Sequence, residues 1–273
     1  MTPMAGETKQ RSNLQLRIIS GVILAIAVLG LTWWGGYPFR LFAVAMAAAM
    51  FYEWMSMRGE DHKVHLAISR FVLAGALALM LVGFAPAFVF SGIFIAAALA
   101  AISGMVAGRG LWAAWGILYS AVPAATLIFL RGNAPEGVWT IVFLFAVVWG
   151  TDTIAYFTGR ALGGPKLAPS ISPGKTWSGA IGGAVGGVIA SLIVANIAWD
   201  GVHLPTVAVV AVLLSVASQA GDLFESAVKR RHGVKDSGNL IPGHGGVMDR
   251  VDGLVAASVL LFVLWIPFLT GME

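Results

Sequence analysis

The feature of this sequence that most restricts its fold is a series of long apolar segments separated by short polar ones. A helix of about 20 apolar residues is long enough to cross the hydrocarbon core of a bilayer. Because an open backbone in lipid would leave polar groups unpaired, each such segment must be helical. We interpret nine segments as membrane spans: 15–34, 38–57, 66–84, 86–107, 111–130, 136–158, 177–199, 204–224 and 251–271. The expected fold is all-α, a polytopic transmembrane helix bundle.

Composition agrees with a membrane protein and excludes several kinds of chemistry. Only 11% of the residues are charged and 58% are hydrophobic, whereas a soluble domain carries about 25% charged residues. The chain has no cysteine, so disulfides, thiolate catalysis and cysteine zinc sites are excluded. The first 16 residues are largely polar, and a cleavable signal peptide is not expected.

The basic residues predict the orientation of the bundle. With the N-terminus in the cytoplasm, the nine spans put all but two of the 17 Lys and Arg residues on the cytoplasmic side, the exceptions being Arg40 and Arg131. We therefore interpret the net charge of +4 as topological rather than as a sign of nucleic-acid binding. Two polar loops, 159–176 and 225–250, then face the cytoplasm. We divide this single membrane unit into N-terminal helices, 1–140, and a catalytic region, 141–273.

Glycines are concentrated within the predicted spans, most clearly from Gly179 to Gly187. Small residues in a membrane helix allow a neighbouring helix to approach closely. This segment therefore predicts tight helix packing, with loose packing or a kink as the alternative.

Charged residues of both signs are concentrated in residues 222–252. Asp222 ends one predicted span and Asp249 precedes the next. A carboxylate at membrane depth is costly unless it is paired or binds an ion, and hard oxygen ligands favour Mg²⁺ or Mn²⁺. The alternative is an acid–base pair, such as Asp249 with Lys229 or Arg230. Weaker metal-ligand candidates are Asp152, Glu225 and Asp252. For Asp152, an ion pair with Arg160 is an equally weighted alternative.

Basic residues beside these acids suggest a phosphate clamp, because a triphosphate must be neutralised before another anion attacks it. Lys supplies a point charge and Arg a two-pronged donor. The same residues would also serve as a membrane anchor on the cytoplasmic side. The predicted catalytic residues are Lys175, Lys229, Arg230, Lys235 and His244.

Two short polar motifs complete the predicted site. Gly245 and Gly246 permit close backbone approach to an anion, or form an ordinary turn. Ser172 and Thr176 precede a predicted helix, whose N-terminus favours anions, although either could be a simple helix cap. The predicted substrate-binding residues are Ser172, Thr176, Ser226, Gly245, Gly246 and Arg250. Outside this region Glu53, between Tyr52 and Trp54, is expected to be an interfacial anchor.

These motifs resemble those of the phosphatidate cytidylyltransferases, also called CDP-diacylglycerol synthases. The resemblance is densest from about residue 148 to 253 and only general in residues 1–140. The matching segments are Ser172-Pro173-Gly174-Lys175-Thr176, Ser226-Ala227-Val228-Lys229-Arg230, Lys235-Asp236-Ser237-Gly238 and Pro242-Gly243-His244-Gly245-Gly246-Val247-Met248-Asp249-Arg250-Val251-Asp252.

The resemblance implies that CTP and phosphatidic acid react to give CDP-diacylglycerol and pyrophosphate. It further implies a Mg²⁺ requirement with Asp222 and Asp249 as principal ligands, and it suggests a second cation and a homodimer. We expect a bacterial inner membrane location with the site facing the cytoplasm. The alternatives are a CTP-dependent polyprenol kinase or other lipid kinase and, less favoured because no internal repeat is evident, an anion transporter.

Overall fold

The computed structural model describes residues 5–59, 62–241 and 245–270, with side chains described for 19–59, 62–241 and 245–265. Within these residues the protein forms nine α-helices and one short β-hairpin. The elements are α1 (Ala5–Trp34), α2 (Gly36–Arg58), α3 (Lys63–Val82), α4 (Pro86–Val106), α5 (Trp112–Arg131), α6 (Glu136–Leu162), β1 (Lys166–Ala168), β2 (Ser172–Thr176), α7 (Trp177–Ala198), α8 (Leu204–Arg231) and α9 (Met248–Thr270).

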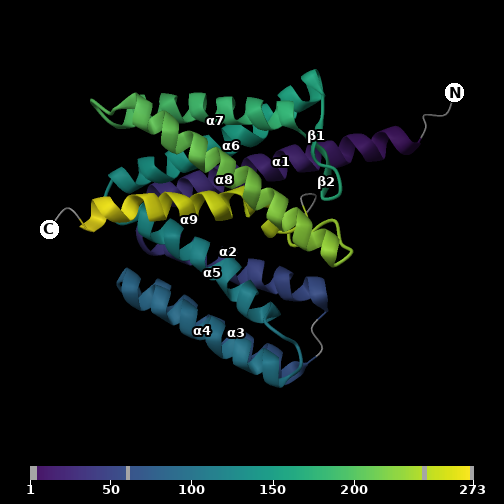
Figure 1. Cartoon of the computed structure of the whole chain (residues 1–273), viewed down its shortest axis with the longest axis vertical. Coiled ribbons are helices and arrows are strands. Elements are labelled where there is room, and N and C mark those ends of the chain that lie inside the picture. The colour runs from purple at the N-terminus through teal and green to yellow at the C-terminus, as the bar shows by residue number, and fades with distance from the viewer. Residues whose placement is uncertain (1–4, 60–61, 242–244, 271–273) are drawn as a thin grey trace.

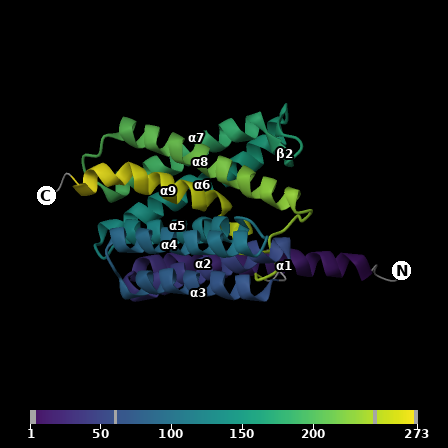
Figure 2. The ribbon, with the colours of Figure 1, turned by 60° about the horizontal axis from the view of Figure 1, so that its bottom comes forward.

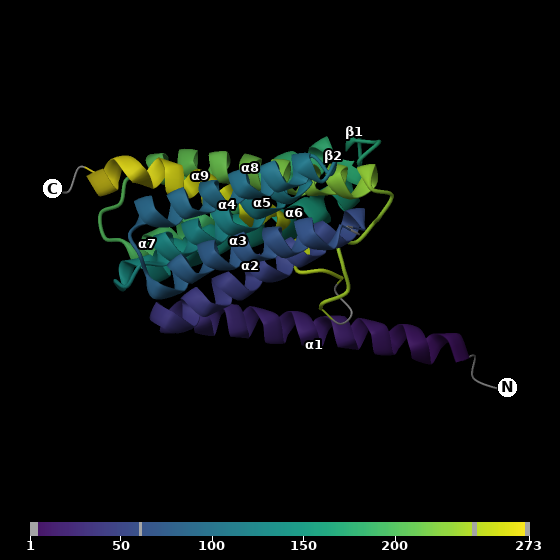
Figure 3. The same cartoon turned by 90° about the horizontal axis from the view of Figure 1, so that it is seen from below.

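The helices lie side by side in two groups (Figure 2). One group contains α2, α3, α4 and α5, and the other contains α6, α7, α8 and α9. Helix α5 packs against α9 and joins the two groups. Helix α1 runs along one side of the bundle, and its N-terminal part extends beyond the other helices (Figure 3).

The helices have the length and composition of membrane spans. Six of those described, α3 to α8, are long and apolar enough to cross a bilayer, which makes this an integral membrane protein. Each of the nine predicted spans coincides with a helix, although α1 begins ten residues before its predicted span and α8 ends seven residues after its own. The prediction of an all-α bundle is therefore confirmed, whereas the count of nine spans stays a prediction. The described apolar part of α1 is the shorter segment Ile19–Trp34.

Glycines let α6 and α7 approach each other closely, as the sequence predicts. Gly183 of α7 lies against α6, where an added Cβ would be 2.8 Å from both the Thr151 carbonyl oxygen and the Ala155 Cβ. A larger side chain would force the two backbones apart. The prediction of tight packing is confirmed, and this contact fixes α7, whose N-terminus borders the site, against α6.

A small hairpin precedes α7 where the sequence predicted a loop. Strands β1 and β2 are antiparallel, with Lys166 opposite Thr176 and Ala168 opposite Ser172. Thr176 ends β2 and caps α7, since its side-chain oxygen accepts a hydrogen bond of 3.1 Å from the Gly179 N–H. The cap joins the hairpin directly to the first turn of α7.

Arg40 and Arg131, the two basic residues predicted to lie on the outer side of the membrane, both contact the C-terminal end of another helix. Buried Arg131 donates from Nε to the Thr32 carbonyl (2.5 Å) and from Nη2 to the Trp33 carbonyl (3.2 Å). These carbonyls end α1 and have no partner within the helix, so a guanidinium there stabilises the helix terminus. Arg40 lies against Gly83, which has a φ of 86° at the C-cap of α3. Arg131 therefore has a structural role.

The hairpin, the C-terminal end of α8 and the beginning of α9 lie at one end of the bundle, and the C-terminus of the protein lies at the other (Figure 1). Consecutive helices run in alternate directions, so both polar loops reach the end from which α1 begins (Figure 3). Residues from distant parts of the sequence meet there.

Candidate active site

A cavity of about 620 Å³ opens between α6, the hairpin, α7 and α8. Charged and polar residues line it together with glycines, alanines, Tyr156 and Leu167. Its lining includes Asp152, Tyr156, Arg160, Lys166, Lys175, Thr176, Gln219 and Asp222. A space of this size is typical of small-molecule binding sites.

Lys175 and Asp222 form an ion pair at the wall of this cavity. Lys175 comes from β2 and Asp222 from α8, and Lys175 Nζ donates to Asp222 Oδ2. Their side chains remain 27% and 29% exposed, so both groups are accessible from the cavity. Ser226, one turn further along α8, donates to Asp222 Oδ1 (3.3 Å). This pair thus joins the first predicted polar loop to the beginning of the charged segment 222–252.

Asp152 lines the same cavity from α6. The sequence left open a pairing of Asp152 with Arg160, but Arg160 donates to the Tyr156 hydroxyl instead (3.0 Å). Asp152 is therefore placed among the cavity-lining acids, beside Asp222.

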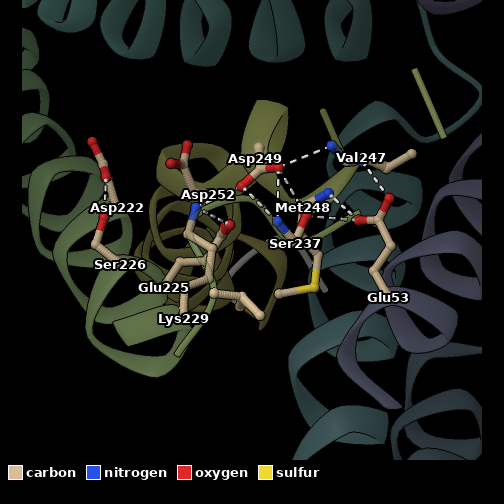
Figure 4. A network of polar contacts seen from close by, with 12 residues as sticks. Glu53, Asp222, Glu225, Ser226, Lys229, Ser237, Val247, Met248, Asp249 and Asp252 are labelled. Carbon is tan, nitrogen blue, oxygen red and sulfur yellow. Dashed lines mark hydrogen bonds and ion pairs between the residues drawn. The ribbon is translucent and has the colours of Figure 1, made fainter. Parts of the chain in front are cut away.

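Asp252 faces the part of α8 that carries Asp222. A Cβ added to Gly221, the neighbour of Asp222, would be 2.7 Å from the Asp252 carbonyl oxygen. Asp252 also lies within electrostatic range of both Asp222 and Asp152. In Figure 4 the Asp252 carboxyl group lies between those of Asp222 and Asp249. The backbone of Asp252 thus packs directly against the stretch of α8 that bears Asp222.

The buried Lys229 lies between two further acids, Glu225 and Asp249. Lys229 Nζ donates to Glu225 Oε1 (3.0 Å) on its own helix and to Asp249 Oδ1 (2.5 Å) on α9. The side chains of Lys229 and Asp249 are only 9% and 6% exposed. Tyr119 of α5 donates to the other oxygen of Glu225 (3.3 Å). The acid–base pair that the sequence offered as an alternative is therefore present, and its basic partner is Lys229.

Further donors converge on Asp249 from the loop before α9 (Figure 4). The Ser237 N–H lies 3.2 and 3.0 Å from the two carboxylate oxygens, and the Ser237 hydroxyl lies 3.0 Å from Oδ2. The Gly246 N–H also donates to Oδ2 (2.9 Å). Hydrogen bonds from donors of this kind stabilise the ionised carboxylate.

The acidic residues do not form a complete metal cage. Among the residues that the structure describes, no three His, Asp or Glu side chains are grouped so as to hold an ion by themselves. Mg²⁺, however, is usually bound by one or two carboxylates together with substrate phosphates and water. With only one or two carboxylates, such as the predicted ligands Asp222 and Asp249, an ion would need a bound phosphate to complete its coordination.

The other predicted residues are divided between internal contacts and the surface. Thr176 is buried and acts as a helix cap, and the N–H of Gly246 is used by Asp249. Exposed Arg230 donates to the Val234 carbonyl (3.0 Å). Ser172 lies in β2, Lys235 and Arg250 are exposed, and Gly245 has a φ of 81°. His244 lies outside the described residues.

The prediction of an interfacial role for Glu53 is wrong. Glu53 is 1% exposed and accepts hydrogen bonds from Ser237 Oγ (3.0 Å), Val247 N–H (2.7 Å) and Met248 N–H (2.8 Å). The flanking aromatic residues pointed to the membrane interface, yet Trp54 is itself buried. A carboxylate within an apolar segment was the signal that pointed to a buried partner instead.

The chain belongs to the cytidylyltransferase family, whose model matches residues 15–267. It is 49% identical over 255 residues to the phosphatidate cytidylyltransferase of Brucella abortus biovar 1 (strain 9-941), covering 92% of this chain and 93% of that relative. It is 31% identical over 265 residues to the phosphatidate cytidylyltransferase of Rickettsia bellii, covering 94% and 92%. The enzyme of the same name from Haemophilus influenzae is 45% identical over 134 residues, or 45% of this chain.

Proposed function

We propose that this protein transfers CMP from CTP to phosphatidic acid and releases pyrophosphate, so that CDP-diacylglycerol is formed. The observation that carries this proposal is the Lys175–Asp222 pair, which joins the hairpin to α8 at the wall of a 620 Å³ cavity in a member of the cytidylyltransferase family. The names of the relatives supply the acceptor, phosphatidate.

In this reaction a phosphate oxygen of phosphatidic acid attacks the α-phosphorus of CTP. The new P–O bond forms as the bond from the α-phosphorus to the bridging oxygen breaks, and pyrophosphate takes that electron pair. The attacking oxygen is already ionised, so no strong general base is needed. Both reactants are anions, and the main task of the protein is to neutralise them.

Basic residues of the cavity wall, of α8 and of the loop after it suit this task. Lys175 lies in the cavity wall, and exposed Arg230 and Lys235 follow at the C-terminal end of α8 and in the next loop. Lys229 is buried between two carboxylates, so its role is to hold Asp249 in place. His244 would position a phosphate, as the motif suggests.

A divalent cation, most naturally Mg²⁺, completes the proposal. Asp222 and Asp249 are the residues that would hold it together with substrate phosphates, as the family resemblance implies, and Asp152, Glu225 and Asp252 are weaker candidates. Bound there with substrate, it would stabilise the charge on the phosphate oxygens. We also propose a second cation, following the family resemblance.

We propose a membrane arrangement that lets a lipid react with a soluble nucleotide. Nine spans with a cytoplasmic N-terminus would put the cavity at the inner face of a bacterial inner membrane, consistent with the basic residues. Apolar parts of the cavity wall, such as Ala155 and Ala180, would let the acyl tails of phosphatidic acid remain in lipid while its headgroup reacts. A homodimer also belongs to this proposal.

The test uses purified protein, phosphatidic acid and CTP labelled at either the α- or the γ-phosphate. Label from the α-phosphate should enter the lipid fraction only when Mg²⁺ is present, with pyrophosphate as the other product. Transfer of γ-label would instead indicate a CTP-dependent lipid kinase. Absence of both transfers, under conditions where a phosphatidate cytidylyltransferase relative is active, would contradict the proposal.

A further inference from the structure

Glu53 links the N-terminal helices to the loop that carries the site. It lies in the last part of α2, and its carboxylate reaches a segment nearly 200 residues later in the sequence (Figure 4). Oε1 accepts from the Val247 N–H (2.7 Å), and Oε2 accepts from the Met248 N–H (2.8 Å) and the Ser237 hydroxyl (3.0 Å). Nearly complete burial makes this carboxylate part of the core.

These contacts make Glu53 a cap for α9. The first N–H groups of a helix have no partner within it, and a negative charge at this end is favourable. Helix α9 begins at Met248, whose N–H donates to Glu53, and Asp249 is the next residue. By fixing where α9 begins, Glu53 fixes the backbone from which the Asp249 side chain extends.

Ser237 forms a second connection between the same two carboxylates. Its hydroxyl lies 3.0 Å from Glu53 Oε2 and 3.0 Å from Asp249 Oδ2. A hydroxyl carries one hydrogen, so it donates to one carboxylate at a time and holds both within reach. Glu53 therefore acts on Asp249 through the helix start and through Ser237.

Two glycines show how closely the loop is fitted to Glu53. A Cβ added to Gly246 would be 2.6 and 2.7 Å from the two Glu53 carboxylate oxygens, and one added to Gly238 would be 3.0 Å from Glu53 Cγ. Side chains at either position would displace the loop. In the structure, both glycines serve the packing of the loop on α2.

We propose that Glu53 is a positioning residue for the transfer reaction, setting Asp249 and hence Lys229 in place from the N-terminal half of the protein. This inference rests on the proposed function, since its main readout is cytidylyl transfer. It gives the N-terminal helices a direct part in forming the site. A displacement of about 1 Å in a catalytic group can reduce the rate about a hundredfold, so the effect should fall mainly on kcat.

The principal variant is Glu53→Gln, and its matched control is Glu136→Gln, an exposed glutamate in the first turn of α6. We expect Glu53→Gln to reduce kcat at least about tenfold with little change in the KM for CTP, while the control retains wild-type values. Thermal unfolding in detergent should show that the folded variant is the species assayed. A wild-type kcat for folded Glu53→Gln would overturn the inference.

A double-mutant cycle keeps the test decisive where Glu53→Gln lowers stability. Ser237→Ala removes only the bridging hydroxyl and should also reduce kcat. The two changes together should cost less than the product of their separate effects, because both act on Asp249. Fully multiplicative effects, or losses explained entirely by the amount of folded protein, would overturn the positioning role. Absence of transfer by the wild-type protein would instead contradict the proposed function.

Discussion

Lys229 Nζ lies 2.5 Å from Oδ1 of Asp249, and this ion pair joins the last turns of α8 to the first turn of α9. The same ammonium group lies 3.0 Å from Glu225 Oε1. One buried cation is thus shared by two buried carboxylates. This arrangement fixes Asp249 by charge as well as by the backbone donors of the preceding loop.

Replacing Lys229 with Met should strongly destabilise the protein. The change leaves Glu225 and Asp249 close together without their shared cation, and breaking a buried ion pair typically costs about 3–5 kcal/mol. Thermal unfolding in detergent measures the effect, with Lys63→Met at the exposed start of α3 as the control. An unfolding midpoint equal to that of the control would contradict a structural role for this cation.

Replacing Lys175 with Gln should reduce activity while leaving stability nearly unchanged. The Lys175–Asp222 pair is more than a quarter exposed on both sides, and such pairs contribute only about 0–1 kcal/mol to stability. Loss of one group that stabilises transition-state charge typically costs about a hundredfold in rate. Steady-state transfer kinetics and an unfolding curve separate the two effects. A rate within twofold of the wild type would remove Lys175 from the proposed clamp.

Enlarging Gly183 should disturb the contact between α6 and α7. An alanine Cβ would lie 2.8 Å from the Thr151 carbonyl oxygen, and overpacking typically costs about 1–3 kcal/mol. Gly75 is a matched helical control, because nothing lies within 4 Å of an added Cβ there. We expect Gly183→Ala to lower the unfolding midpoint and Gly75→Ala to leave it unchanged or raise it. Equal midpoints would show that the two helices readily separate.

Asp252 should affect the requirement for Mg²⁺. The Asp252 backbone packs against Gly221, the neighbour of Asp222, and Asp252 is one of the candidate ligands, so Asp252→Asn should raise the Mg²⁺ concentration needed for half-maximal transfer. Asp200→Asn, in the exposed turn after α7, controls for the loss of one negative charge. A Mg²⁺ titration of transfer rate gives the comparison, and identical titration curves for the two variants would exclude Asp252 from the ion site.

Local patterns in the sequence were sufficient to predict the helices and one tight contact. The length of each apolar segment predicted a helix, because this signal depends only on residues that are close together in the sequence. The glycines from Gly179 to Gly187 predicted the packing of α7 for the same reason. The hairpin was not predicted, because β1 and β2 are too short to show an alternating pattern.

The candidate site was predicted in part. The concentration of charge in residues 222–252 indicated where to look, and the structure brings Lys175 of the first polar loop to Asp222 at the start of this segment. The contact of Glu53 with Ser237 spans 184 residues and leaves no periodic pattern in the sequence. The choice of Lys229 over Arg230 as the partner of Asp249 likewise depends on how α8 and α9 pack, which residue spacing alone does not determine.

The most direct test is a Mg²⁺ titration of labelled CTP-to-lipid transfer by Asp249→Asn, beside the wild type and Asp200→Asn. The substitution keeps the size of the side chain and removes its charge. We expect a loss of at least about 3 kcal/mol of transition-state stabilisation, or about a hundredfold in rate, with an altered Mg²⁺ requirement. Near-wild-type activity at an unchanged Mg²⁺ requirement would contradict the assignment of the reaction centre to the acids of α8 and α9.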